Sequence, residues 1–270
     1  MDLKLGNRNV LVTGSYRGTG QVIAERFAAE GARVFYHALD EETATGLRAL
    51  TPESNILIGN ITTDPGAEAI LEQFRSAIDS LQPDDPAARE LHVLVNNYGA
   101  AERGRWETSS TDDWVEAYQV NTLSAVRMIQ HFTPLMSAGG RVINIGTIGS
   151  TRPNSIMPHY YAAKGALATL TVSLAKELGP RGITVNLVSP GLIRTPEVEA
   201  RFMIEAKREG WGSDFDTAEA EITRRHFPNP LGRIATREEV ADTVLFLAGQ
   251  PAAFINGQNL RVDGGALDIV

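Results

Sequence analysis

Short apolar runs and amphipathic stretches alternate along the 270 residues of the chain. Runs rich in β-branched residues are typical of strands buried on both faces, and they predict strands at 9–13, 33–37, 55–59, 91–95, 141–145, 183–188 and 259–262. Apolar residues at helical spacing predict helices between them, at 21–30, 41–50, 65–81, 111–136, 159–179 and 237–248. This alternation predicts an α/β fold in which one doubly wound parallel sheet carries helices on both faces.

The alternation stops between Thr195 and the helix predicted at 237–248. Connections in such sheets usually take about two to six residues, so this one is long enough for a lid. We expect a helical lid at about 196–230 that covers a substrate and excludes water. The alternative is a helical hairpin anchored to the body or to a neighbouring subunit. The large apolar side chains expected to serve either role are Phe202, Met203, Trp211, Phe215 and Phe227.

Composition narrows the possible functions. The chain has no cysteine, which excludes disulfides, thiol catalysis and cysteine-bound metals and favours a reducing, cytoplasmic location. A net charge of −8 without a basic block argues against nucleic acid as a partner. The sequence has no apolar run of the roughly 18 residues that a membrane span requires, and no signal-like amino terminus. We expect neither a membrane partner nor a metal site.

A glycine-rich turn follows the first predicted strand and precedes a helix. Its glycines, Gly14, Gly18 and Gly20, are spaced G-x-x-x-G-x-G rather than the G-x-G-x-x-G of the usual dinucleotide fingerprint. In this context, glycines let the backbone approach a diphosphate whose charge is stabilised by the helix amino terminus. We favour a cofactor-binding turn over a plain glycine turn. The fold is then a single Rossmann-type domain over residues 1–270.

A second candidate site spans the strand at 141–145 and the helix after it. Thr147 follows the strand, while Tyr160 and Lys164 are four residues apart and share one helical face. An ammonium group near the phenol would lower its pKa and make Tyr160 a general acid or base. Tyr161 is rotated by about 100° and is expected to point elsewhere. Because Y-x-x-x-K also occurs by chance, its weight depends on its context.

That context is the carboxyl edge of the predicted sheet, where ligands bind in such folds. The glycine turn, Asn97, Thr147 and Pro190-Gly191 all fall at this edge. Asn121 is a further candidate, because asparagine is unfavourable inside the helix predicted at 111–136. It either lies exposed or faces the site.

The ordered set of motifs resembles the classical short-chain dehydrogenase/reductase family over almost the full length. It consists of T-G-S-Y-R-G-T-G (13–20), N-N-Y-G (96–99), Asn121, Thr147, Y-Y-A-A-K (160–164) and P-G-L-I-R-T (190–195). G-N-I at 59–61, I-G-T at 145–147 and G-x-N-L-x-V-D-G-G at 257–265 are most similar to 3-oxoacyl-[acyl-carrier-protein] reductases.

The resemblance implies a catalytic tetrad of Asn121, Thr147, Tyr160 and Lys164. Tyr160 would exchange the proton, Lys164 would lower its pKa and hold the nicotinamide ribose, and Asn121 would fix a water. Thr147 stands where the family usually has serine, and Tyr98 stands where it has a small alanine. Thr147 keeps the hydroxyl, and Tyr98 is expected to reshape the floor of the site.

The resemblance also implies a nicotinamide coenzyme. Thr195 and Ile193 would contact the carboxamide, whereas Asn60, Ile61, Asn97 and Gly99 would line the adenosine side. The full set expected to bind the coenzyme is Gly14, Ser15, Tyr16, Arg17, Gly18, Thr19, Gly20, Asn60, Ile61, Asn97, Gly99, Tyr160, Lys164, Pro190, Gly191, Ile193 and Thr195.

The residues near the end of the second predicted strand favour NADP(H) over NAD(H) as the coenzyme. NAD enzymes usually place a carboxylate there, and this chain has Ala38. Arg17 matches the basic residue that family members use on the 2′-phosphate. Asp40, two positions further on, is expected to cap a helix instead. His37 is expected to lie in solvent at the strand end.

The expected function is hydride transfer between NADP(H) and a ketone or secondary alcohol. The predicted lid favours an apolar, aromatic-bearing or acyl-type small-molecule substrate over a small polar sugar. The alternative is a catalytically weak protein that senses NAD(P). The helices at 111–136 and 159–179 are apolar over more than one stripe, which favours a homo-oligomer, a tetramer above all, over one thick core.

Overall fold

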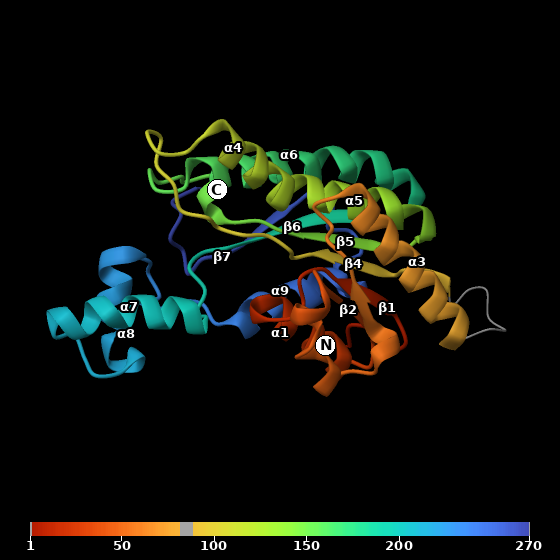
Figure 1. The fold of residues 1–270 in the computed structure, drawn as a ribbon, viewed down its shortest axis with the longest axis horizontal. Coiled ribbons are helices and arrows are strands. Elements are labelled where there is room, and N and C mark those ends of the chain that lie inside the picture. The colour runs from red at the N-terminus through yellow and green to blue at the C-terminus, as the bar shows by residue number, and fades with distance from the viewer. Residues whose placement is uncertain (1, 82–88, 270) are drawn as a thin grey trace.

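A computed structural model describes residues 2–81 and 89–269. Within these ranges the strands form one parallel sheet in the order β3-β2-β1-β4-β5-β6-β7 (Figure 1). The predicted doubly wound α/β fold is therefore confirmed. The strands are β1 Asn9–Val12, β2 Arg33–Ala38, β3 Ile56–Ile58, β4 Val93–Asn96, β5 Arg141–Ile145, β6 Thr184–Pro190 and β7 Asn259–Val262.

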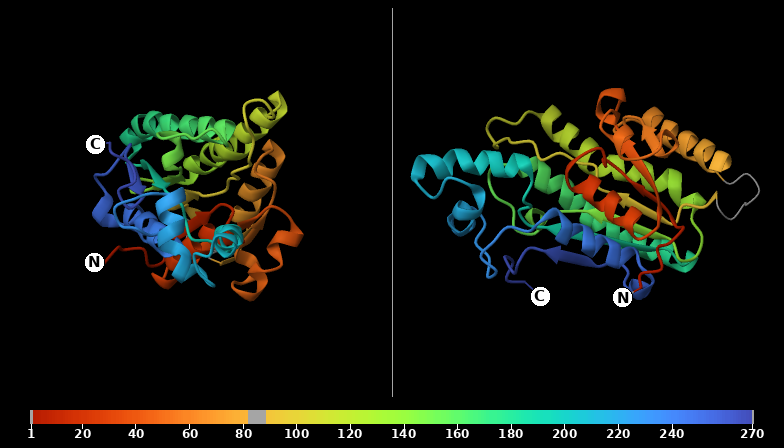
Figure 2. Two further views of the ribbon diagram at one scale, coloured as in Figure 1. Left: turned by 90° about the vertical axis from the view of Figure 1, so that its left-hand side faces the viewer. Right: turned by 90° about the horizontal axis from the view of Figure 1, so that it is seen from below.

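Helices cover both faces of the sheet, as Figures 1 and 2 show. One layer holds α1 Gly18–Ala29 and α9 Arg237–Ala248, with the short α2 Glu41–Ala44 near the edge. The opposite layer holds α3 Asp64–Leu81, α4 Thr111–Tyr118, α5 Ser124–Phe132 and α6 Pro158–Leu178. The helices α7 Pro196–Glu209 and α8 Phe215–His226 form a hairpin that projects beyond the sheet.

Alternation along β1 builds a core on each side of the sheet. Val10 and Val12 pack with residues of α1 and α9, whereas Leu11 packs with residues of α3 and α5. Successive side chains of a strand point to opposite faces, so a strand covered on both faces is apolar throughout. This explains why the strands are visible as short apolar runs.

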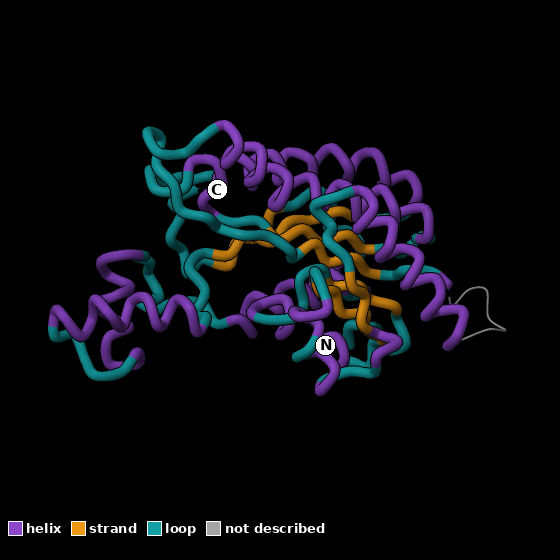
Figure 3. Tube along the Cα trace, viewed as in Figure 1, coloured by secondary structure: helices purple, strands orange, loops and turns teal. Residues whose placement is uncertain are grey.

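The helix predicted at 111–136 is not continuous. It is interrupted by a π-helical turn at Gln119–Leu123, between α4 and α5, and it ends in a 3₁₀ turn at Thr133–Leu135. Figure 3 distinguishes the helices from the strands that they cover by colour. The Nδ2 atom of Asn121 donates to the carbonyl oxygen of Ala117 at 3.1 Å, so the side chain bonds within the turn. Single π-helical turns occur frequently at functional sites.

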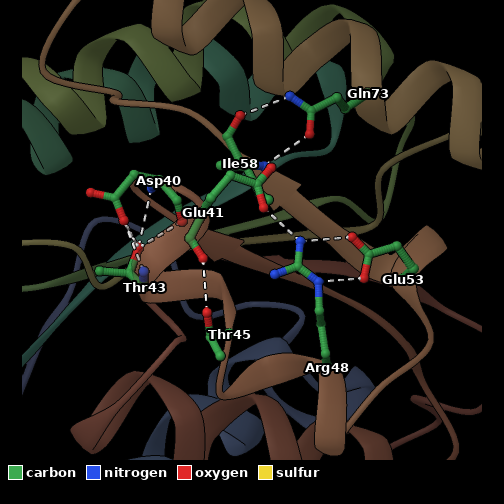
Figure 4. Close-up of polar contacts among 8 residues, drawn as sticks. All are labelled: Asp40, Glu41, Thr43, Thr45, Arg48, Glu53, Ile58 and Gln73. Atoms are coloured by element: carbon green, nitrogen blue, oxygen red, sulfur yellow. Dashed lines mark hydrogen bonds and ion pairs between the residues drawn. The ribbon is translucent and has the colours of Figure 1, made fainter.

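The helix after β2 is also shorter than the one predicted at 41–50. It ends at Ala44, and a separate 3₁₀ turn occupies Leu47–Ala49. As predicted, Asp40 caps α2: it accepts from the backbone nitrogen of Thr43 at 2.8 Å (Figure 4). Figure 4 also shows how the edge strand β3 is covered. The amide of Gln73 bonds both the N–H and the C=O of Ile58, at 2.9 and 2.8 Å.

No helix in the described parts of the chain is long and apolar enough to cross a membrane.

Candidate active site

The strand at the centre of the site, β5, leads directly to the residues predicted to transfer the proton. Thr147 follows its carboxyl end, and α6 brings Tyr160 and Lys164 beside it. The Thr147 hydroxyl lies near enough to that of Tyr160 to lower the Tyr160 pKa, and Nζ of Lys164 donates to the carbonyl oxygen of Ile145 at 2.8 Å. Thr147 also accepts from the backbone nitrogen of Gly149 at 3.1 Å, which fixes its side chain. The structure thus brings the three predicted residues together.

The expected lowering of the Tyr160 pKa is wrong. Burial raises the pKa of Tyr160 to about 12, and the Thr147 hydroxyl offsets only part of that effect. Burial also lowers the pKa of Lys164 to about 8. Desolvation disfavours both charged forms, so Tyr160 holds its proton firmly and Lys164 is easily neutralised.

Asn121 is buried and faces the loop after β4. Its Oδ1 accepts from the backbone nitrogen of Ala100 at 3.1 Å, and its Nδ2 donates to the Ala100 carbonyl at 2.9 Å. A Cβ atom on Gly99 would lie 2.8 Å from Oδ1 of Asn121 and 3.1 Å from Nζ of Lys164. Gly99 therefore leaves the space in which Asn121 and Lys164 approach each other.

The glycine turn has the features that a diphosphate requires. Gly14 and Gly18 have φ angles of 63° and 62°, which suit glycine. A Cβ on Gly18 would meet nothing within 4 Å, whereas one on Gly20 would lie 2.3 Å from Nδ2 of Asn97. The helix α1 begins at Gly18 without a side-chain cap or an acidic residue in its first turn. Its first N–H groups are thus suited to a phosphate, and a dinucleotide fits the site.

His37 lies under this turn and is fully buried, which corrects the expectation of a solvated strand end. Its Nδ1 accepts from the backbone nitrogen of Gly14 at 2.8 Å, and its Nε2 lies 2.8 Å from the carbonyl oxygen of Gly59. Burial lowers the pKa of His37 to about 4. The one sign in the sequence is that apolar Ala38 extends the strand past His37, which is therefore not its last residue.

Asn60 and Ile61, which were both expected on the adenosine side, differ in their surroundings. Asn60 lines a cavity of about 560 Å³ together with Leu39, Thr62, Tyr98 and residues of α4 and the π-helical turn. Ile61 is buried in the core, so only its backbone can face this cavity. Tyr98 packs against Gly14 and does not line the larger cavity that contains Tyr160, so it borders the adenosine side rather than the floor of the catalytic site.

Ser15 and Asn97, two further predicted coenzyme residues, form hydrogen bonds within the protein. Ser15 donates to the Val12 carbonyl at 2.8 Å and accepts from the His37 backbone at 2.9 Å. Asn97 donates to the carbonyl oxygens of Thr13 and Gly14, at 3.0 and 3.2 Å.

After β6, the chain turns toward the hairpin through Gly191 and Ile193. Ile193 forms a parallel bridge with Ala235. Thr195 caps α7 by accepting from the Val198 nitrogen at 3.3 Å. The Thr195 hydroxyl thus caps the amino terminus of α7.

The larger cavity, of about 810 Å³, contains Thr147 and Tyr160. Phe202 of α7 lines it, as does Phe227, which packs so closely that a Cβ on Gly191 would lie 2.2 Å from its ring. The other expected lid residues do not line it. Met203, Trp211 and Phe215 belong instead to the apolar cluster that joins α7 to α8. Trp211 lies under Arg225, whose Cζ is 4.6 Å from its ring centre.

Tyr161 also lines this cavity, contrary to the prediction that it points elsewhere. Its ring centre is 5.5 Å from that of Tyr160, and its hydroxyl accepts from Nδ2 of Asn154 at 2.8 Å. A Cβ on Gly149 would lie 2.0 Å from the Tyr161 ring. The curved loop at Gly149 therefore wraps around the helix and brings both tyrosines to one cavity. Over the described ranges, no group of three or more His, Cys, Asp or Glu side chains is placed to hold a metal ion.

Comparison with known proteins agrees with this geometry. The family model described as Enoyl-(Acyl carrier protein) reductase matches residues 14–266. The 3-oxoacyl-[acyl-carrier-protein] reductase FabG of Escherichia coli is 33% identical over 258 residues, which cover 94% of this chain and 95% of the relative. The uncharacterized oxidoreductase YvrD of Bacillus subtilis is 34% identical over 270 residues, or 99% of both chains.

Solved structures show the same relationship. L-sorbose reductase from Gluconobacter frateurii, complexed with NADPH and L-sorbose, has a TM-score of 0.87 at 27% identity over 100% of both chains. The angucycline C-6 ketoreductase LanV with bound NADP has a TM-score of 0.80 at 26% identity, covering 97% of this chain and 96% of its own. The chain belongs to the classical short-chain dehydrogenase/reductase family of NAD(P)-dependent oxidoreductases.

Proposed function

We propose that the protein reduces a ketone to a secondary alcohol with NADPH and that Tyr160 donates the proton. The observation that carries this proposal is the pair of partly buried side chains, Thr147 and Tyr160, at the wall of the larger cavity. A phenol with a pKa of about 12 remains protonated at pH 7, which suits a general acid more than a general base.

Each member of the tetrad has a distinct role in this proposal. NADPH, when bound, supplies the hydride. The Tyr160 hydroxyl gives its proton to the carbonyl oxygen, and the Thr147 hydroxyl donates a hydrogen bond that stabilises the phenolate left behind. Lys164, which is largely charged at pH 7, stabilises the same negative charge. Asn121 holds the loop after β4 in place beside Lys164 through its two bonds to Ala100.

The coenzyme lies, in this proposal, along the carboxyl edge of the sheet. The glycine turn and the amino terminus of α1 bind the diphosphate, and Asn60, Ile61, Asn97 and Gly99 border the adenosine. Lys164 holds the nicotinamide ribose. Pro190, Gly191, Ile193 and Thr195 border the carboxamide, so the cap that Thr195 gives α7 would have to share its hydroxyl.

A preference for NADP(H) over NAD(H) rests on the charges near the end of β2. Ala38 is fully buried and offers no carboxylate. Asp40 is engaged as the cap of α2. Arg17 is exposed, stacks at 5.5 Å on the Tyr16 ring and forms no ion pair with any described residue. Comparing kcat/KM for the two coenzymes tests this, and a tenfold preference for NAD(H) would overturn it.

The cavity wall supports a substrate with an apolar body, of the acyl or aromatic-bearing kind. Apolar residues from several elements line it: Ile148, Ile156, Met157, Leu192, Val198, Phe202 and Phe227. Phe202 is the residue through which α7 would cover such a substrate.

Exposed apolar side chains support the proposed homotetramer. On α6, Val172 is 44% exposed, and on α4 Val115 and Tyr118 are 54% and 42% exposed. These helices lie side by side on one face of the molecule (Figure 1). A partner subunit would bury them. Sedimentation that shows a stable monomer at micromolar concentration would exclude the oligomer.

The function is tested by following reduced nicotinamide absorbance with a panel of ketones. We expect oxidation of NADPH with apolar and aryl ketones and little with small polar sugars. Tight NADPH binding without turnover across a broad panel would contradict the proposal and favour a coenzyme sensor.

A further inference from the structure

Three arginines line the larger cavity, and they come from three different segments. Arg103 lies on the loop after β4, Arg152 on the loop after β5, and Arg201 on α7. Arg152 donates to the carbonyl oxygen of Ala266 at 2.9 Å, which ties it to the carboxyl-terminal segment. Arg103 and Arg201 form no hydrogen bond or ion pair with any side chain that the structure describes.

The cavity offers these arginines little counter-charge. The one acidic side chain among its lining residues is Glu205, whose Oε2 lies 2.9 Å from Nε2 of His226. The lining therefore carries a surplus of positive charge in a protein whose net charge is −8.

Other arginines of the hairpin have acidic partners. Arg194 pairs with Asp216 at 2.7 Å, Arg208 with Glu209 at 2.8 Å, and Arg225 with Glu221 at 2.7 Å. Arg201, on the same helix as Arg208, instead lies over the ring of Phe202, with Cζ 4.3 Å from the ring centre. That stacking keeps its guanidinium beside the cavity without pairing it with a carboxylate.

Arg103 and Arg201 are also close enough to repel each other. Burial lowers the pKa of Arg201, and the positive charge of Arg103 lowers it further. Burial raises the pKa of Tyr161, and the Arg103 charge offsets part of that rise, which places Arg103 near the tyrosines. Both side chains are exposed, so water screens part of this repulsion, and an anion between them would relieve the rest.

We propose that the substrate carries an anionic group, a carboxylate or a phosphate, that binds between Arg103 and Arg201 while its carbonyl lies at Tyr160. The inference deepens the proposed function and rests on it. Guanidinium groups bind both anions through paired, charge-assisted hydrogen bonds. The substrate class is thus an oxo compound with an apolar body and an acidic end. Arg152 is already bonded to Ala266 and is not required.

The first test compares 4-oxo-4-phenylbutanoate with its methyl ester, which have the same ketone and differ in charge. We expect the wild type to prefer the acid. In Arg201→Gln and Arg103→Gln, the ratio of kcat/KM for acid over ester should fall by about tenfold or more, because a hydrogen bond to a charged group is lost. The controls are Arg208→Gln on α7 and Arg105→Gln on the loop of Arg103, which do not line the cavity. An unchanged ratio in both cavity variants would overturn the proposal.

A second measurement separates this inference from the proposed function, because it needs no turnover. Calorimetry follows the binding of 4-phenylbutanoate and 4-phenylbutanamide to the protein saturated with NADP⁺. We expect the carboxylate to bind more tightly than the amide and to lose that advantage in Arg201→Gln. Anion binding without reduction of any ketone would count against the proposed function alone. Reduction of ketones with equal binding of carboxylate and amide would overturn the inference alone.

The two anion sources are distinguished with acetoacetyl-pantetheine and acetoacetyl-4′-phosphopantetheine. If the wild type prefers the phosphorylated compound and Arg201→Gln abolishes that preference, the bound anion is a phosphate of the phosphopantetheine kind. A preference confined to 4-oxo-4-phenylbutanoate would identify a carboxylate. Equal kcat/KM values within both the ester pair and the pantetheine pair would contradict an anion site.

Discussion

The Nδ1 atom of His37 accepts a hydrogen bond from the backbone N–H of Gly14 at 2.8 Å. Because Nδ1 is the acceptor, the ring proton is on Nε2, which donates to the Gly59 carbonyl at 2.8 Å. One neutral imidazole therefore joins the glycine turn to the end of β3. A protonated ring would lose the bond to Gly14, so this junction requires His37 to be uncharged.

We predict that His37 makes the protein acid-sensitive. Its folded pKa is about 4, below its ordinary value of 6.5, so between these pH values the unfolded chain binds more protons. Stability should therefore fall as the pH drops from 6.5 to 4, by up to about 3 kcal/mol from this group. Urea unfolding at pH 7 and pH 4.5 measures it.

The matched variant is His37→Gln, whose amide is neutral at both pH values. Its free energy of unfolding should fall less with acid than that of the wild type. His92, whose pKa burial also lowers, is present in both proteins and cancels in the comparison. Equal acid dependence in the two proteins would show that His37 is not the responsible group.

We predict that Lys164 makes the kcat/KM of ketone reduction decline at alkaline pH, which gives the pH profile an alkaline limb. Its pKa is about 8, whereas Tyr160 keeps its proton to about 12. As Lys164 loses its charge, the Tyr160 phenolate formed in the reaction loses stabilisation, so kcat/KM should decline above about pH 8. Lys164→Arg stays charged in this range and should lack the limb, whatever its overall rate. A flat wild-type profile to pH 10 would contradict the role given to Lys164.

The Thr147 hydroxyl should matter more than its methyl group. Thr147→Ser keeps the donor and should retain most of the activity. Thr147→Val keeps the shape without the donor and should lower kcat by about 10²-fold, as the loss of one oriented hydrogen bond does. Steady-state kinetics measures kcat for both variants. A measurement of coenzyme binding by each variant is the control. A Thr147→Val variant near wild type would mean that another group bonds the Tyr160 hydroxyl.

Much of the architecture could be predicted because buried parallel strands have an unmistakable pattern. The run from Arg141 to Ile145 is a strand as predicted, and Arg237–Ala248 and Asn259–Val262 match the predicted elements. Since every strand of the sheet runs in one direction, its carboxyl end locates the chemistry. That is how Thr147 and Tyr160 could be assigned to one site before any contact was known.

Other features depend on three-dimensional contacts that no periodicity encodes. The π-helical turn around Asn121 is accompanied by a side-chain bond to Ala117, and Tyr161 packs closely against Gly149. Helical spacing alone predicted that Tyr161 points away from the cavity. Trp211 illustrates the same limit, because a large apolar residue in a lid packs on its own hairpin as readily as on a substrate.

The central claim, that Tyr160 is the proton donor, is tested most directly by Tyr160→Phe. With a ketone that the wild type reduces, we predict that kcat falls by about 10²- to 10⁴-fold while NADPH affinity, measured by fluorescence titration, stays near wild type. The control is Tyr161→Phe, which loses only the bond with Asn154 and should keep most of its turnover. Near-wild-type turnover in Tyr160→Phe, or equal losses in both variants, would contradict the account.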